Sequence, residues 1–307
     1  MPSASNPVNQ GFRAILRDPA ILLTEIVWRW SFGAAAFLLL FFSVVTLLGS
    51  IHVSETDAAA WRSNNPTMMA QALVAMLMES GPRILSVALR ALPVITLLWI
   101  ILGAAGRTLT INRLGKGTVS FRTVLALHCA RAFVLWLAAG GIIAAIVFDA
   151  GVSSHGAETD LFLYYALVFW SVVLIGGFWA AANWYLSLAP ICSLRSGGGF
   201  LRSTWDAIRL AKAQSGDFGG ISLIFGIYRL VALAIAFVLC VLPSGLMGTW
   251  PRSYTAWVVA VSLVYLAVGD LLYLARMAAY LIVAWPEAEG AGVIGDLQRA
   301  GGQPAVF

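Results

Sequence analysis

Asp270 is the residue whose position in this sequence most demands a chemical explanation. Thirteen of the fourteen Asp and Glu residues lie in loops, in tails or near the ends of apolar segments. Asp270 instead lies deep inside the last long apolar segment, Tyr254–Trp285. A carboxylate in hydrocarbon costs several kcal/mol unless it is neutral or paired. We therefore expect an arginine from within another apolar segment to reach Asp270.

Two arginines lie at a depth that suits this pairing. Arg131 is about nine residues inside the third apolar segment and Arg229 about eight inside the fifth, roughly 12–14 Å from one membrane face. Asp270 lies in the same half of the membrane on a helix running the other way, so the depths match. Arg90 lies nearer the opposite face, which makes it a poorer partner.

Arg276 is on the same predicted helix as Asp270, with Tyr273 and Tyr280 on either side of it at helical spacing. Six residues separate Arg276 from Asp270, which puts them about 120° apart around the helix, so the two do not face each other. Two interpretations stay open. One is a polar pocket, open to the cytoplasm, for an anionic solute, a lipid headgroup or a proton relay. The other is a structural ion pair that fixes helix register. The predicted cluster comprises Asp270, Arg131, Arg229, Arg276 and Tyr273.

The sequence predicts neither a cofactor nor a bound metal. His128 beside Cys129 could suggest haem, but His52 and His155 fall in loops on the other side, so no second intramembrane histidine is available. Four methionines suggest copper, but neighbouring residues point to different helix faces and do not converge. These methionines are Met68, Met69, Met76 and Met78. No catalytic motif or close pair of carboxylates is present, so we expect no enzyme activity.

Composition indicates a membrane protein. Hydrophobic residues make up 60% of the chain and charged residues 11%, with a mean hydropathy of +0.87. A soluble domain is about one-quarter charged, so most of this chain must face lipid. The net charge of +5 could suggest nucleic-acid binding. The basic residues lie between apolar segments rather than in one patch, so membrane topology explains them better.

Six apolar segments are long enough to cross about 30 Å of hydrocarbon. They are Val27–Ile51, Ile84–Ala105, Thr123–Phe148, Leu161–Leu188, Ile221–Leu246 and Tyr254–Trp285. The sequence therefore predicts an all-α polytopic bundle with three regions. Residues 1–26 form an N-terminal cytoplasmic segment, residues 27–285 the transmembrane domain, and residues 286–307 a flexible cytoplasmic tail.

Basic residues are concentrated on one side of these segments. That side carries Arg13, Arg17, Arg29, Arg107, Arg113, Lys116, Arg122, Arg195, Arg202, Arg209 and Lys212, whereas the other carries Arg62, Arg83 and Arg252. Positively charged loops face the cytoplasm. We therefore expect a multi-pass protein of the bacterial inner membrane with both termini in the cytoplasm.

Short amphipathic helices are predicted before two of the odd-numbered spans. In the first, Val8, Phe12 and Ile15 oppose two arginines; in the second, Leu201, Trp205 and Ile208 oppose Arg202, Asp206 and Arg209. Such helices lie flat at the level of the lipid headgroups. A weak repeat accompanies them, in Gly11-Phe12-Arg13, Ser120-Phe121-Arg122 and Gly199-Phe200-Leu201-Arg202. A separate helix is expected from Pro66 to Ser80, ended by Gly81-Pro82.

The layout of spans and amphipathic helices, with Phe12-Arg13 and Phe121-Arg122 leading into spans, resembles a group of uncharacterised bacterial six-helix membrane proteins. That group includes the membrane domain attached to some glycerophosphodiester phosphodiesterases. The resemblance implies a fold and carries no functional residue. The soluble phosphodiesterase barrel is absent from this sequence, so that activity is not implied.

These observations predict a non-catalytic integral membrane protein. We expect an accessory or structural subunit of an inner-membrane complex, or a protein that organises the membrane, with membrane lipids and other membrane subunits as partners and no nucleic acid. The alternative is a transporter or channel for a small anionic solute or lipid headgroup, using the cluster around Asp270.

Overall fold

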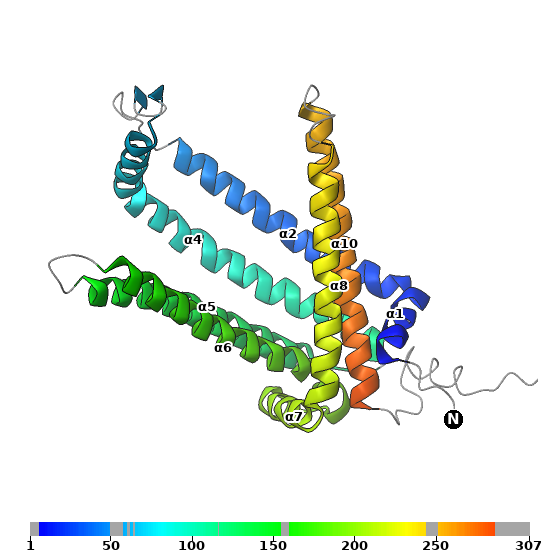
Figure 1. Cartoon of the computed structure of the whole chain (residues 1–307). Coiled ribbons are helices and arrows are strands. Elements are labelled where there is room, and N and C mark those ends of the chain that lie inside the picture. Colours follow the sequence, from blue (N-terminus) through cyan, green and yellow to red (C-terminus); the bar gives the residue numbers. More distant parts are fainter. Residues whose placement is uncertain are drawn as a thin grey trace, which may run out of the picture. The chain divides into compact units, whose positions relative to one another are not determined.

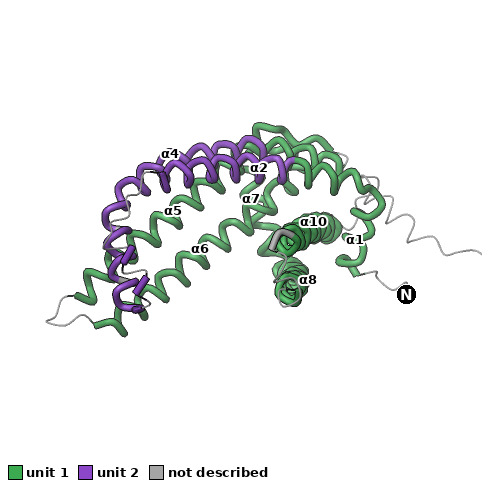
Figure 2. The backbone as a smooth tube through the Cα atoms, turned by 90° about the horizontal axis from the view of Figure 1, so that it is seen from above, with its two compact units in different colours: residues 1–27, 104–307 green, residues 28–103 purple. Residues whose placement is uncertain are grey.

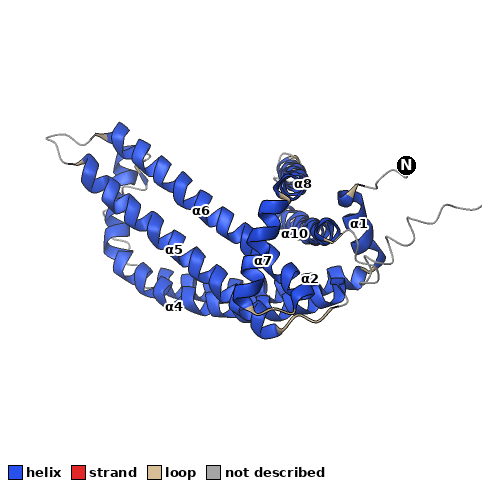
Figure 3. Ribbon diagram, turned by 90° about the horizontal axis from the view of Figure 1, so that it is seen from below, coloured by secondary structure: helices blue, strands red, loops and turns tan. Residues whose placement is uncertain are grey.

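The structure is a computed structural model that describes residues 6–49, 58–59, 62–63, 65–115, 117–154, 160–243 and 251–285. The predicted tail at 286–307, and His52 and His155, lie outside these residues. The helices are α1 (Pro7–Arg17), α2 (Pro19–Leu48), α4 (Pro66–Gly115), α5 (Phe121–Ser153), α6 (Leu161–Ser196), α7 (Phe200–Ala213), α8 (Ser215–Val241) and α10 (Pro251–Ala284). The described residues contain no strand (Figure 3). Six helices are long and apolar enough to cross a membrane, which confirms the predicted all-α fold.

α2 and α4 are both longer than the sequence predicted. α2 begins at Pro19 rather than Val27, because proline suits the first turn, where its missing N–H has no intrahelical acceptor. The predicted break at Gly81-Pro82 is wrong, since α4 runs unbroken from Pro66 to Gly115. In hydrocarbon a backbone that left the helix would lose its remaining hydrogen bonds, so proline is tolerated inside a spanning helix. Figure 1 shows α4 bent along its course, as proline commonly causes.

Packing divides the chain into two compact units (Figure 2). Unit 1 consists of residues 1–27 and 104–307, and unit 2 of residues 28–103. In unit 2, α2 and α4 border an apolar crevice of about 380 Å³. Arg90 lies on the rim of this crevice and is exposed. The predicted division at residues 26 and 285, which separates cytoplasmic from membrane-embedded parts, stays a prediction.

Within unit 1, α10 is the central helix of one group. α1 and α8 both pack on it, and Figures 1 and 2 both show α8 beside α10. The apolar face of α1, with Val8 and Ile15, is buried against the protein rather than lying on lipid as expected. Phe12 contacts Phe225 on α8, at a ring distance of 5.4 Å. Gly11 permits this packing, because a Cβ there would collide with the carbonyl oxygen of Ala275.

A second group in unit 1 is the pair α5 and α6, with α7 packed on α6. α6 ends at Gly197, which adopts the left-handed conformation (φ 59°) and donates its N–H to the carbonyl oxygen of Ser193. α5 begins directly after Ser120 and α7 directly after Gly199, so the second and third copies of the weak repeat occupy the same position. The first copy differs, because residues 11–13 lie in the middle of α1.

Candidate functional site: buried charges around Arg107

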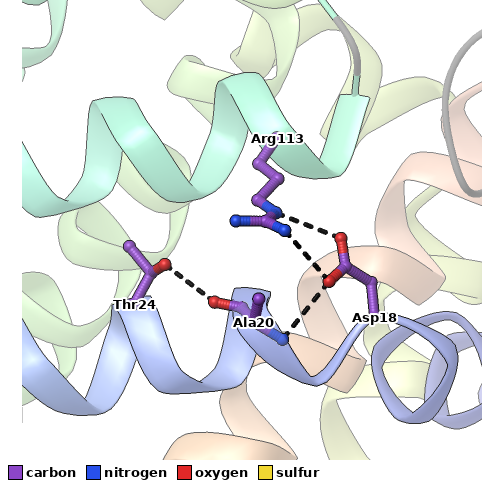
Figure 4. Close-up of polar contacts among 4 residues, drawn as sticks. All are labelled: Asp18, Ala20, Thr24 and Arg113. Atoms are coloured by element: carbon purple, nitrogen blue, oxygen red, sulfur yellow. Dashed lines mark hydrogen bonds and ion pairs between the residues drawn. The ribbon is translucent and has the colours of Figure 1, made fainter.

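The site begins at the junction between α1 and α2, where Asp18 holds two helices together (Figure 4). One carboxylate oxygen of Asp18 accepts the N–H of Ala20 at 3.2 Å and so caps α2. The same carboxylate accepts from Arg113 Nε at 3.1 Å and from its Nη2 at 3.3 Å. This fork-shaped contact ties the start of α2 to the end of α4. It brings the first turns of α2 alongside the last turns of α4.

Two turns deeper, Arg107 of α4 meets Glu25 of α2 in a buried ion pair. Nη2 of Arg107 lies 3.2 Å from Oε1 of Glu25, and the two side chains are 5% and 0% exposed. The other carboxylate oxygen of Glu25 accepts from the hydroxyl of Thr110 at 2.9 Å. Both charges are therefore removed from solvent, and Glu25 is held by an ion pair with Arg107 and a hydrogen bond from Thr110.

α10 supplies the other walls around the Arg107 guanidinium. Nη1 lies 3.1 Å from the sulfur of Met277, and the guanidinium carbon lies 4.4 Å from the centre of the Tyr273 ring. Asp270 is 5% exposed and close enough to Arg107 to interact with it electrostatically. Asp270 thus lies near a guanidinium, as expected, but that of Arg107, which lies beyond the end of the predicted second span.

His128 and Arg131 on α5 extend the cluster on another side. His128 is 3% exposed, and its Nδ1 lies 2.9 Å from the carbonyl oxygen of Val124. Arg131, Arg107 and Glu25 are all within electrostatic range of His128. Arg131, which is half-buried, therefore belongs to the same neighbourhood as the Glu25–Arg107 pair.

Arg276 lies against two aromatic rings of its own helix, those of Tyr273 and Tyr280. Its guanidinium carbon is 5.4 Å from the Tyr273 ring and 5.9 Å from the Tyr280 ring. Tyr280 in turn makes a short hydrogen bond with Ser222, which joins α10 to α8.

Arg229 is the predicted cluster member that the structure does not bring to Asp270. Its side chain is exposed on α8, and no contact to the cluster is present among the described residues. The structure therefore places Asp270 and Tyr273 near Arg107, Arg131 near the same group through His128, and Arg276 against the Tyr273 ring, and it leaves Arg229 aside.

Sequence reasoning missed Glu25, Arg107, Thr110 and Met277. Glu25 and Arg107 both fall outside the predicted spans, because the first of these spans begins at Val27 and the second ends at Ala105. A second buried carboxylate was also missed. Asp149 directly follows the predicted third span, which ends at Phe148, but it lies inside α5, is 3% exposed, and accepts a hydrogen bond from Ser171 of α6 at 3.1 Å.

The cluster combines three guanidinium groups and two carboxylates inside apolar surroundings. Such a group can fix the register of the helices that contribute to it, and its excess positive charge could also attract an anion. The described residues contain no group of three His, Cys, Asp or Glu side chains placed to hold a metal ion.

No known protein family, curated protein sequence or solved structure matches this chain. The resemblance to the membrane domain of glycerophosphodiester phosphodiesterases therefore stays a prediction. The six long apolar helices support a multi-pass, helical integral membrane protein.

Proposed function

We propose that this chain is a non-catalytic integral membrane protein that serves as a structural or accessory subunit of a bacterial inner-membrane complex, or that organises the membrane around it. The observation that supports this proposal is the buried Glu25–Arg107 pair, in which intramembrane charges meet each other. Charges used for transport or catalysis would instead face a water-filled path or a substrate.

The contacts of Arg107 favour a structural role for the cluster. A carboxylate from α2 and a thioether and an aromatic ring from α10 surround one guanidinium on α4. Removing one member of a buried ion pair leaves an uncompensated charge, so the pair selects the one arrangement in which the three helices meet correctly. A scaffold that presents a fixed outer surface to lipids and partner subunits requires this kind of register.

Oligomeric state in native membranes tests the subunit proposal. The tagged chain is crosslinked in intact membranes, extracted in a mild detergent, and analysed for mass and composition. We expect a species of defined stoichiometry that contains another membrane protein and survives dilution. A solitary monomer, with or without crosslinking, would refute the subunit version and leave only the membrane-organising one.

A second candidate is a binding site for a small anion or lipid headgroup, with transport as its consequence. The observation that favours it is the excess of guanidinium groups over carboxylates around Arg107, with Arg131 and Arg276 at the edge of the cluster. Proteoliposomes loaded with chloride, phosphate or an organic anion measure flux directly. The transport candidate predicts flux that Arg131→Ala or Arg276→Ala lowers at least tenfold and that the exposed control Arg229→Ala leaves unchanged. No flux by the wild type would refute it.

A further inference from the structure

Successive residues of a helix lie about 100° apart around its axis, and on this basis α7 has three distinct faces. One face carries Ser203, Ala207 and Ala211, which are buried and let the helix lie close to its neighbours. About 120° away lies a second face with Leu201, Trp205 and Ile208. A third face carries Arg202, Asp206 and Arg209. The second, apolar face separates it from the buried residues on one side.

The ridge of Leu201 and Trp205 points away from the protein. Leu201 is 79% exposed and Trp205 is 55% exposed, although both are large apolar side chains. The guanidinium carbon of Arg209 lies 5.3 Å from the Trp205 ring, so a basic group sits directly against the ridge. An exposed ridge of Leu and Trp bordered by arginines is the pattern of a helix that lies in the plane of a lipid surface.

The position of α7 in the chain fits this orientation. It links the end of α6 to the start of α8, and both are apolar enough to cross a membrane, so α7 lies at a membrane face. Figure 3 shows α8 nearly end-on and α7 along its length, so the two helices do not run parallel. α7 therefore runs along the membrane plane when α8 crosses it.

The basic residues on and beside α7 favour lipids with anionic headgroups. The exposed basic residues on and beside α7 are Arg195, Arg202, Arg209 and Lys212, and the acidic ones are Asp206 and Asp217. Arg202 and Asp206 are 3.9 Å apart, and the Arg202 side chain is 72% exposed, so this pair is loose and Arg202 stays available to a phosphate. Arg195 packs against Trp285 at 5.8 Å, which holds a further guanidinium at the same level.

We propose that α7 is a docking surface for anionic phospholipid headgroups. Leu201, Trp205 and Ile208 enter the boundary of the acyl chains, while Arg202 and Arg209 contact lipid phosphates. The aliphatic stem of Lys212 lies along the ridge, and its ammonium group reaches the headgroups. This inference depends on the membrane location of the chain and is independent of whether it is a subunit or a transporter.

Lipid retention by the purified full-length chain tests the proposal. Native mass spectrometry counts phosphatidylglycerol and phosphatidylcholine bound from mixed micelles that contain the two lipids in equal amounts. We expect the wild type to favour phosphatidylglycerol. The double variant R202Q/R209Q should lose about fivefold of this preference for each arginine, because one basic residue near an anionic surface contributes about 1 kcal/mol. The control R62Q/R83Q, with the same loss of charge at exposed arginines elsewhere, should keep the preference.

Two further measurements separate the apolar contribution to lipid binding from the ionic one. Trp205→Ser should reduce the binding of both lipids and leave their ratio unchanged, because it removes only the apolar contact. For the wild type alone, raising NaCl from about 0.05 M to about 0.5 M should lower the preference, because salt screens exposed charges. Equal binding of the two lipids by the wild type, or an equal loss in R62Q/R83Q and R202Q/R209Q, would overturn the proposal.

Discussion

Removing the carboxylate of Glu25 should destabilise the protein strongly. In Glu25→Ala the guanidinium of Arg107, which is 4% exposed, stays buried without its closest carboxylate. Breaking a buried ion pair by removing one partner costs about 3–5 kcal/mol. Asp270, Tyr273 and Met277 remain around Arg107, so we expect the lower end of this range, about 3 kcal/mol.

A double-mutant cycle separates the pair itself from its surroundings. Arg107→Met keeps much of the side-chain length and should cost about 3 kcal/mol, because it leaves the carboxylate of Glu25 buried. The double variant with Glu25→Ala should cost little more than either single one, since neither charge then remains unpaired. We therefore expect a coupling energy of about 2–3 kcal/mol, well above the variation seen between independent sites.

The assay is equilibrium unfolding in mixed detergent micelles, followed by circular dichroism as the fraction of sodium dodecyl sulfate rises. Arg90→Met is the matched control, because it makes the same substitution at an exposed position on the same helix. It should change the free energy of unfolding by no more than about 0.5 kcal/mol. Single variants that each cost less than about 1 kcal/mol and add without coupling would refute the reasoning.

Three further predictions concern packing and helix ends, each measured as the change in free energy of unfolding in the same assay. Gly11→Leu should cost about 1–3 kcal/mol, because the new side chain meets the backbone carbonyl of Ala275 and separates α1 from α10. An unchanged free energy of unfolding would contradict this packing. Asp18→Ala should cost about 1 kcal/mol through loss of the α2 cap, and Asp18→Asn should cost less, because an amide oxygen can still cap the helix. Equal losses in the two variants would assign the stabilisation to the ion pair with Arg113 instead. Gly197→Ala should cost about 1 kcal/mol, because Gly197 has a φ of 59°; an unchanged stability would rule out the left-handed helix end.

Hydropathy predicted the number of spans because it depends only on composition over a window of about 20 residues. The ends of the spans were harder to place, because charged residues inside a helix resemble the start of a loop. Glu25 and Arg107 each lower the local hydropathy, so both were assigned to membrane edges. In the structure they neutralise each other, which lets the helices continue past them. An ion pair between two helices cannot be predicted from the hydropathy pattern along either helix alone.

The candidate site was predicted in part for the same reason. Asp270 lies far inside an apolar run, so its need for a cation could be inferred without knowing its neighbours. Which arginine side chain lies near Asp270 depends on the rotation of each helix about its axis as well as on depth in the membrane. Depth alone favoured both Arg131 and Arg229. Rotation turns Arg131 toward the cluster and Arg229 outward on α8. Pro19, a good first residue for a helix, was the one signal that could have placed Glu25 inside a span.

The most direct test is a cryo-electron microscopy map of the full-length chain in lipid nanodiscs, at a resolution that shows side chains around Arg107. We predict continuous side-chain density joining Arg107 to Glu25 at about the 3.2 Å seen here, with Tyr273 and Met277 filling the remaining space. Density for a water-filled path or a bound anion between Arg107 and Glu25 would contradict the structural role of the cluster.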